Sequence, residues 1–305
     1  MKTRPKTFFL GLILLITISF GLSFCATVHI SETKKITLKH GKVIVKEIGG
    51  VTFHTYMVQG MVSHIIETNN FLILQDTVRN GPHNEELKNY LESIGKTLNR
   101  IIISHGHDHH WVGLEMFPDV SIYANAETIK EIQEYGDQML QKLKERKGEK
   151  LIPYKTAVVP QHVITPGEET IDGVLFRFII PTQEFLSGFR YGERVLFTEL
   201  PKQRAIIHHH LAYVGLHFPP PPIPDRIKML KQLKAKKYNW VMAGHGIPLG
   251  HEFFDKAVAY YETAQKVIEE SSDVKTAKKK LMTAYPNYEG ESLLDLLLPF
   301  HFKNQ

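Results

Sequence analysis

A histidine-rich loop directly after an apolar run constrains the fold of this chain more than any other feature. Residues 101–103 (Ile-Ile-Ile) predict a buried strand, and the next seven residues, Ser-His-Gly-His-Asp-His-His, carry four imidazoles. Neutral imidazole is the commonest metal ligand in proteins, and a strand fixes the position of the loop at its end. His105 and His107 can point the same way while His110 closes from the far side. A solvated turn is the alternative, but the spacing favours a metal site.

Two further histidine loops follow apolar strands. Residues 208–210 (His-His-His) come after residues 205–207, and His245, flanked by glycines, comes after residues 240–242. Glycines beside a histidine let the backbone turn sharply and bring the ring close to a ligand. Three loops of this kind argue against chance surface turns and predict one shared site.

Strand and helix patterns alternate on both sides of the middle of the chain. β-Branched and aromatic runs predict four strands within residues 42–75, and a helical period covers residues 84–94. Asn125 is a candidate N-cap of a long helix, and strands are predicted again within residues 174–207. A helix, a strand and three helices follow. This order predicts an α/β fold of two sheets packed face to face with helices outside.

The first 25 residues predict a targeting segment. Lys2, Arg4 and Lys6 precede an apolar run over residues 8–24, and the only cysteine, Cys25, ends it. Three outcomes stay open: a lipoprotein signal with lipid at Cys25, ordinary cleavage after Cys25, or an uncleaved membrane anchor. Each places residues 26–305 outside the cytoplasm, in the periplasm or secreted, and the lipid or the anchor would associate the chain with a membrane.

Charge argues against a nucleic-acid partner. The net charge is +5, but three of the 37 basic residues belong to the N-terminal segment, and the rest nearly balance the 32 acidic residues. A hydrophobic fraction of 43% is ordinary for a globular protein. We therefore expect a small-molecule substrate and no nucleic acid.

These motifs resemble the metallo-β-lactamase superfamily of binuclear metallohydrolases. The resemblance rests on the motif of residues 104–110 with Gly113 behind it, and on the Gly-His-Gly turn around His245. Residues 211–217 are similar to the segment after the aspartate that bridges two metals in some members. The resemblance implies a four-layer αβ/βα sandwich of two mixed β-sheets, residues 26–305 forming the domain with its C-terminal helices. It also implies that Asp76, at a strand end, supports the metal ligands from behind.

The chain departs from the family pattern at three positions. His109 stands where the family has a ligand aspartate, and the acid has moved one place earlier, to Asp108. The position of the bridging aspartate falls on His210. No histidine lies between Val163 and Ile207, where the third ligand is expected, and Glu184 is the nearest plausible carboxylate.

The departures change the expected metal chemistry. Neutral rings replace both aspartates, so two divalent ions would repel each other with little compensation, and one ion is favoured over a pair. Imidazole ligation suits zinc best, with iron, nickel or copper as alternatives. The predicted ligands are His105, His107, His109, His110, His210 and His245.

The function that the resemblance implies is a zinc-dependent hydrolase that activates water to cleave an ester, amide or lactam-like bond. Asp108 is the predicted catalytic base, with Asp76 as the alternative. A second hypothesis is a catalytically degraded member that binds a metal or a ligand. The missing aspartates and the missing third histidine motivate it.

Overall fold

A computed structural model of the chain describes residues 29–186 and 194–302. The predicted targeting segment, residues 1–25 with Cys25, lies outside the described residues. Within the described ranges, no helix combines the length and apolar character needed to cross a membrane.

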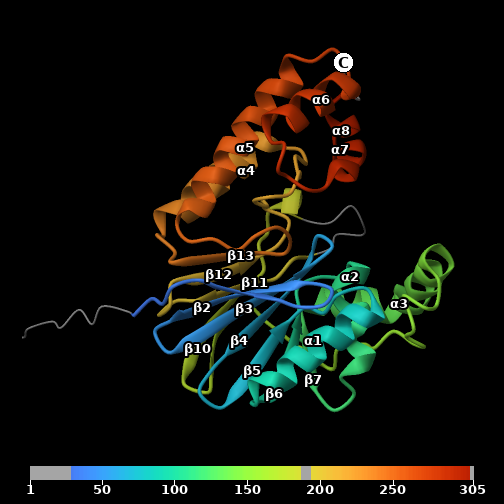
Figure 1. The fold of residues 1–305 in the computed structure, drawn as a ribbon, viewed down its shortest axis with the longest axis vertical. Helices are drawn as coiled ribbons and strands as arrows, with labels where there is room; N and C mark the ends of the chain where they lie inside the picture. Colours follow the sequence, from blue (N-terminus) through green and yellow to red (C-terminus); the bar gives the residue numbers. More distant parts are fainter. Residues whose placement is uncertain (1–28, 187–193, 303–305) are drawn as a thin grey trace, which may run out of the picture.

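The first sheet has eight strands that lie side by side in chain order (Figure 1). They are β1 (Lys34–Thr37), β2 (Lys42–Ile48), β3 (Val51–Val58), β4 (Met61–Glu67), β5 (Phe71–Gln75), β6 (Thr97–Ile103), β7 (Ser121–Ala124) and β8 (His162–Val163). Strands β1 to β5 pair antiparallel, and β5 to β8 pair parallel. The sheet is therefore mixed.

The second sheet has five strands in the order β13-β12-β11-β10-β9. They are β9 (Gly167–Ile171), β10 (Val174–Ile179), β11 (Phe197–Leu200), β12 (Ala205–His208) and β13 (Trp240–Ala243). Only β12 and β13 run parallel, so this sheet is mixed as well.

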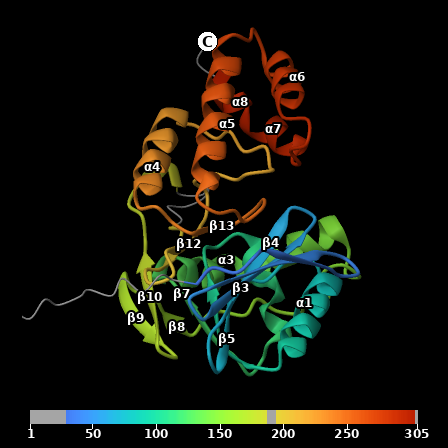
Figure 2. The same cartoon turned by 60° about the vertical axis from the view of Figure 1, so that its left-hand side comes forward.

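Helices lie outside both sheets (Figures 1 and 2). Against the first sheet are α1 (Gly81–Ile94), α2 (Asp108–Trp111) and α3 (Ala126–Lys147), with the 3₁₀ turn η1 (Val112–Met116). The turn η2 (Glu184–Leu186) precedes β11. On the side of the second sheet are α4 (Ile223–Ala235), α5 (Glu252–Glu269), α6 (Val274–Ala284), α7 (Glu291–Leu297) and α8 (Pro299–Phe302). Figure 2 shows α6, α7 and α8 gathered beyond one end of the sandwich.

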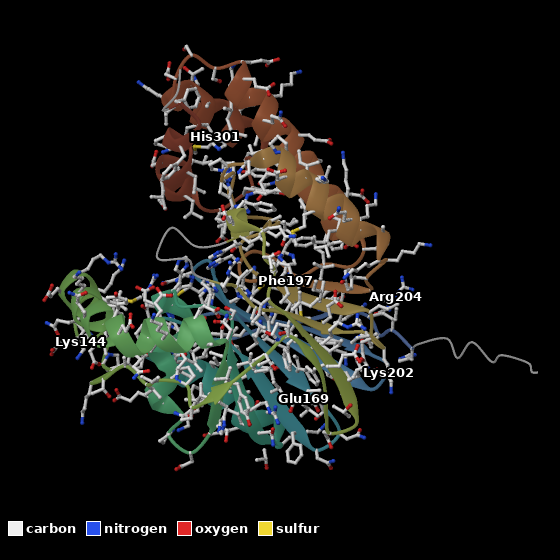
Figure 3. All side chains as sticks on the ribbon, turned by 180° about the vertical axis from the view of Figure 1, so that it is seen from behind. Lys144, Glu169, Phe197, Lys202, Arg204 and His301 are labelled. Carbon is white, nitrogen blue, oxygen red and sulfur yellow. The ribbon has the colours of Figure 1, made fainter. Side chains whose placement is uncertain are left out.

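The core divides into three apolar clusters, one between each pair of layers. Successive strand residues point to opposite faces, so Ile101 and Ile103 on β6 pack toward α1 and α3, whereas Ile102 packs between the sheets. On β12, Ile206 packs toward α4 and α5, and Ile207 packs between the sheets. In Figure 3 the Phe197 side chain lies inside the molecule, whereas Lys144 and Lys202 lie at its outer edges. The predicted four-layer sandwich of two mixed sheets is thus confirmed.

The differences from the predicted elements are local and have physical causes. Strand β1 and most of β9 are exposed, so they lack the apolar alternation that marks a half-buried strand. Within residues 174–207, where strands are predicted, β11 begins at Phe197. A fourth short helix, α8, follows the three expected after β13. Asn125 does cap α3, since its side chain accepts a hydrogen bond from Thr128 N at 2.7 Å.

The parallel pairs bring the candidate site together. Strands β5 and β6 are parallel neighbours in one sheet, and β12 and β13 are parallel neighbours in the other. The carboxyl ends of parallel strands meet at one edge of a sheet, so the loops after them converge. His64 on β4 ties the two sheets at this edge, because its Nε2 lies 3.0 Å from the Ala243 carbonyl oxygen.

The packing behind the first histidine loop predicts a strong effect of a single methyl group. A Cβ at Gly113 would lie 2.3 Å from Nδ2 of Asn84, a buried residue that also hydrogen-bonds the Tyr154 hydroxyl at 2.6 Å. We expect Gly113→Ala to lower the free energy of unfolding by about 1–3 kcal/mol, as overpacking does. Denaturant unfolding measures this. The control Gln138→Ala, at an exposed position on α3, should change the free energy of unfolding by less than about 0.5 kcal/mol. Equal stability of the two variants would show that the contact at Gly113 is not tight.

Candidate metal centre

Seven histidines meet at the edge where the strand ends converge. His105 and His107 come from the loop between β6 and α2, and His109 and His110 lie on α2. His209 and His210 follow β12, and His245 follows β13. Three groups have candidate ligand atoms within 4.8 Å of one another: His105, His107 and His210; His109, His110 and His245; and His105, His110 and His209. The structure therefore brings all six predicted ligands together, and the first two groups share no member.

Two of the rings are anchored by backbone carbonyl groups. His245 Nδ1 lies 2.6 Å from the Gly60 oxygen, and His210 Nδ1 lies 3.1 Å from the Leu186 oxygen. A carbonyl oxygen can only accept, so each Nδ1 must carry the hydrogen. This assignment leaves the lone pair of each neutral ring on Nε2.

Two more rings are anchored by carboxylates. His110 Nδ1 lies 3.0 Å from Asp76 Oδ2, and His109 Nδ1 lies 3.3 Å from Asp108 Oδ1. Burial alone would raise the pKa of both acids, but adjacent histidines, with Arg79 in the case of Asp108, hold each pKa well below its usual range. An ionised carboxylate only accepts, so the hydrogen bond from His109 places the hydrogen on its Nδ1 and the lone pair on its Nε2. The contact of His110 with Asp76 is an ion-pair contact and not a hydrogen bond.

The anchoring leaves lone pairs facing each other. His109 Nε2 and His245 Nε2 are 3.1 Å apart, and neither carries a hydrogen in the assignment above. Two lone pairs at this distance repel unless a cation lies beside them, and one zinc ion can be about 2.0–2.1 Å from both nitrogens. His110 Nε2, in the same group, is buried without a hydrogen-bond partner among the described residues. The donor set thus fits a transition-metal ion.

Burial keeps the rings neutral. It lowers the pKa of His105, His110, His210 and His245 well below the ordinary histidine value, and neighbouring imidazoles lower it further. For His109, burial lowers the pKa more than Asp108 raises it. Neutral imidazole is the form that binds metals, so the cluster needs no deprotonation at neutral pH.

Asp76 lies behind the histidines and does not line the cavity beside them. Its Oδ1 accepts from Ser104 N at 2.7 Å, and its Oδ2 accepts from Ser104 Oγ at 2.7 Å. The same Oδ2 is 2.9 Å from His209 Nε2 as well as close to His110. Ser104 Oγ in turn lies 2.9 Å from His105 Nδ1. One buried carboxylate therefore orients rings from both sheets.

Asp108, the predicted catalytic base, points away from the facing lone pairs. Its carboxylate lies 3.0 Å from an Arg79 nitrogen and 3.6 Å from an Arg146 nitrogen, in addition to His109. It is also outside the set of described residues that line the adjacent cavity. Its contacts are those of a residue that orients His109, and its role as a base stays a prediction.

His209 is the site residue that the sequence analysis missed. It is fully buried against Asp76, and a Cβ at Gly244 would lie only 2.1 Å from its ring. The signal was present in the run of three histidines. However, neighbouring residues of a loop point in different directions, and His210 has a positive φ of 57° that reverses the chain. Only the structure shows that His210 joins His105 and His107 while His209 faces Asp76.

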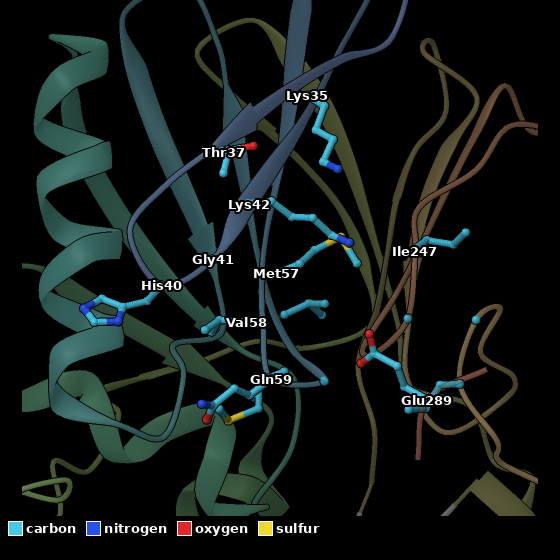
Figure 4. Close-up of a pocket in the computed structure, with 16 residues that line it drawn as sticks. Lys35, Thr37, His40, Gly41, Lys42, Met57, Val58, Gln59, Ile247 and Glu289 are labelled. Carbon is cyan, nitrogen blue, oxygen red and sulfur yellow. The ribbon is translucent and has the colours of Figure 1, made fainter. Parts of the chain in front are cut away.

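A cavity of about 730 Å³ opens beside the cluster. His107, His109, His210 and His245 line it together with Glu184, the carboxylate considered for the third ligand. A smaller hollow of about 300 Å³ is lined by Lys35, Lys42 and Glu289, among others (Figure 4). The β3–β4 turn, residues 58–61, lies between the two, since Gln59 and Gly60 line both.

Comparisons with known proteins agree with this architecture. Residues 61–184 match the family model "Metallo-beta-lactamase superfamily". No curated protein matches the chain. A metallo-β-lactamase from Pontibacter korlensis superposes with a TM-score of 0.51 at 13% identity, covering 76% of this chain and 99% of that one. That likeness supports the fold.

Two other solved structures superpose with slightly lower TM-scores. The DIM-1 metallo-β-lactamase gives a TM-score of 0.49 at 16% identity, covering 77% of this chain and 100% of that one. The metallo-β-lactamase FIM-1 from Pseudomonas aeruginosa, in its mono-zinc form, gives a TM-score of 0.49 at 14% identity, covering 77% of this chain and 96% of that one. The family model on the motif loop and the mixed two-sheet sandwich around it identify residues 61–184 as a metallo-β-lactamase superfamily segment within a fold of that type.

Proposed function

We propose that the protein is an exported metal-dependent hydrolase that cleaves an ester, amide or lactam-like bond of a small molecule. The observation that carries the proposal is the pair of facing Nε2 lone pairs on His109 and His245, beside a cavity that can admit a substrate. A buried arrangement of this kind costs free energy without a cation.

Zinc is the metal that best fits an all-imidazole donor set, and iron, nickel or copper could replace it. When bound, zinc supplies Lewis acidity toward water and toward the polarised bond of a substrate. The group of His109, His110 and His245 would hold the first ion, because Asp76 and Asp108 contact two of its rings and contribute negative charge. The group of His105, His107 and His210 would hold a second ion, with the Ser104 hydroxyl orienting His105 and the Leu186 carbonyl orienting His210.

The residues of this chain would orient and enclose the reaction. Hydrogen bonds to Nδ1 fix the direction of Nε2 in His109, His210 and His245, so little reorganisation of these rings is needed on binding. Gly60 belongs to the β3–β4 turn and anchors His245, which couples the turn at the cavity edge to a ligand ring.

A metal-binding or ligand-binding protein without catalysis is the second candidate. It is favoured by one observation: the three ligand groups contain no carboxylate, and Asp108 is paired with two arginines. A carboxylate so paired is a weak base, since its pKa is held low.

Zinc titration tests the assignment of the first ion. We expect His245→Ala to weaken binding of the first zinc equivalent at least tenfold, about 1.4 kcal/mol, because one of three ligands is lost. His210→Ala should weaken only a second equivalent. Calorimetric titration of metal-free protein measures both, and His251→Ala, whose side chain is 87% exposed, is the matched control. A wild-type protein that binds no zinc would overturn the proposed function.

Turnover of small substrates separates the two candidate functions. We expect zinc-loaded protein to hydrolyse at least one generic ester, amide or lactam, with kcat/KM reduced on the order of 100-fold in His107→Ala and His245→Ala. A chelator should abolish turnover, and added zinc should restore it. His251→Ala should behave as wild type. Stoichiometric zinc without turnover across the three bond classes would instead favour the binding protein.

We also propose export, on the basic residues 2–6 and the apolar run over residues 8–24. Expressed in a bacterium with a periplasm, the full chain should fractionate with the periplasm or membranes, and a chain lacking residues 1–25 should stay in the cytoplasm. Mass spectrometry of the product distinguishes lipid on Cys25 from simple cleavage, and Cys25→Ser should remove only the lipid. Cytoplasmic full-length protein would contradict the proposal.

A further inference from the structure

The cavity beside the metal centre has an apolar wall built by the C-terminal helices. From α7, Leu293, Leu296 and Leu297 line it, and Phe185 and Phe218 line it from other segments. Leu297 is fully buried in the core beneath, whereas Leu296 on the same helix is 54% exposed. Helix α7 is therefore apolar toward the core and also toward the cavity, and the surface that it presents to the cavity is left for another molecule to cover.

The wall is continuous with the candidate metal centre. The Tyr213 ring is 5.0 Å from the His245 ring and 4.5 Å from the Phe218 ring, centroid to centroid. All three residues line the cavity. An apolar group lying on Phe218 would therefore belong to a molecule whose other end is at His245.

A glycine holds α7 close to this wall. Gly290, in a left-handed conformation, precedes α7, and a Cβ there would lie 2.8 Å from Leu216 Cδ1 and 3.3 Å from Leu293 Cδ1. Leu216 also forms a β-bridge with Glu289. The two leucines thus lie on either side of the glycine, and α7 is fixed against the loop that follows His210.

We propose that this wall is an acyl-binding site and that the substrate carries an unbranched apolar acyl chain of medium length. The inference rests on the proposed hydrolase function and names its substrate class. The chain would lie along Tyr213, Phe218 and the leucines of α7, with the scissile bond at His107, His109 and His245. The oxygen of water bonds to the acyl carbon, and the bond between that carbon and the leaving oxygen breaks. One proton of the water goes to the leaving oxygen, which gives the alcohol, and the other stays with the carboxylic acid.

The polar residues of the cavity do not favour an anionic substrate tail. Arg79 is paired with Asp108, and the Arg226 guanidinium donates to the carbonyl groups of His210, Leu211 and Phe185. Glu184 and Glu289 add negative charge at the rim. Each methylene group that leaves water completely, by contrast, raises the binding constant roughly fourfold.

A chain-length series of p-nitrophenyl esters tests the proposal on the zinc-loaded full chain. We expect kcat/KM for the octanoate to exceed that for the acetate at least tenfold, because part of the chain is buried on the wall. Leu296→Ser should reduce this ratio at least threefold. Leu151→Ser, a leucine 39% exposed outside the cavity, is the matched control and should keep the wild-type ratio.

Binding of alkyl hydroxamates separates the acyl site from catalysis. Octanohydroxamate should bind zinc-loaded protein at least tenfold more tightly than acetohydroxamate, measured by calorimetry, and Leu296→Ser should remove most of that difference. Tighter binding without turnover of any ester would retain the acyl site and defeat the hydrolase. Turnover with equal binding of the two hydroxamates and equal rates for short and long esters would retain the hydrolase and overturn the acyl site.

Discussion

The buried carboxylate of Asp76 is the contact on which the rest of the site depends. It follows β5 with a positive φ of 63°, a conformation that turns the side chain back across the strand ends. From there it accepts hydrogen bonds from Ser104 and contacts His110 in one sheet and His209 in the other. Because this charge has no water around it, its partners must stay in place. The positions of the loops after β6 and β12 are therefore linked to one residue.

The replacement of aspartates by histidines changes what the fold must stabilise. A carboxylate ligand brings charge to the metal and can bridge two ions, whereas an imidazole brings one neutral lone pair. In this chain the negative charge lies one contact farther out, on Asp76 and Asp108, and acts through His110 and His109. The site therefore favours a first ion near those two rings. The two separate histidine groups supply enough nitrogen ligands for two ions. Charge therefore decides whether two ions bind together.

The sequence predicted the layers and most of the site, because both depend on periodic or local signals. The apolar run Ile101–Ile103 predicted a buried strand, and β6 does lie between two apolar layers. The spacing of the histidines after it indicated a metal loop. His209 could not be assigned, because adjacent residues in a turn differ only in backbone angles that the sequence does not show. Asp108 was predicted as a base from its place in the motif, and its pairing with Arg146 on α3 depends on tertiary packing.

The chemistry and the proposed specificity are built by different parts of the chain. The family match covers residues 61–184, which contain Asp76 and the loop from His105 to His110. The apolar wall comes mainly from residues 213–221 and from α7, which lie beyond that match. A helix added at the C-terminus can change shape and polarity without moving the strand ends that hold the histidines. Function in this fold can therefore diverge through the wall while the metal-binding edge is retained. In this chain the wall is apolar, and so the substrate should be apolar where it meets α7.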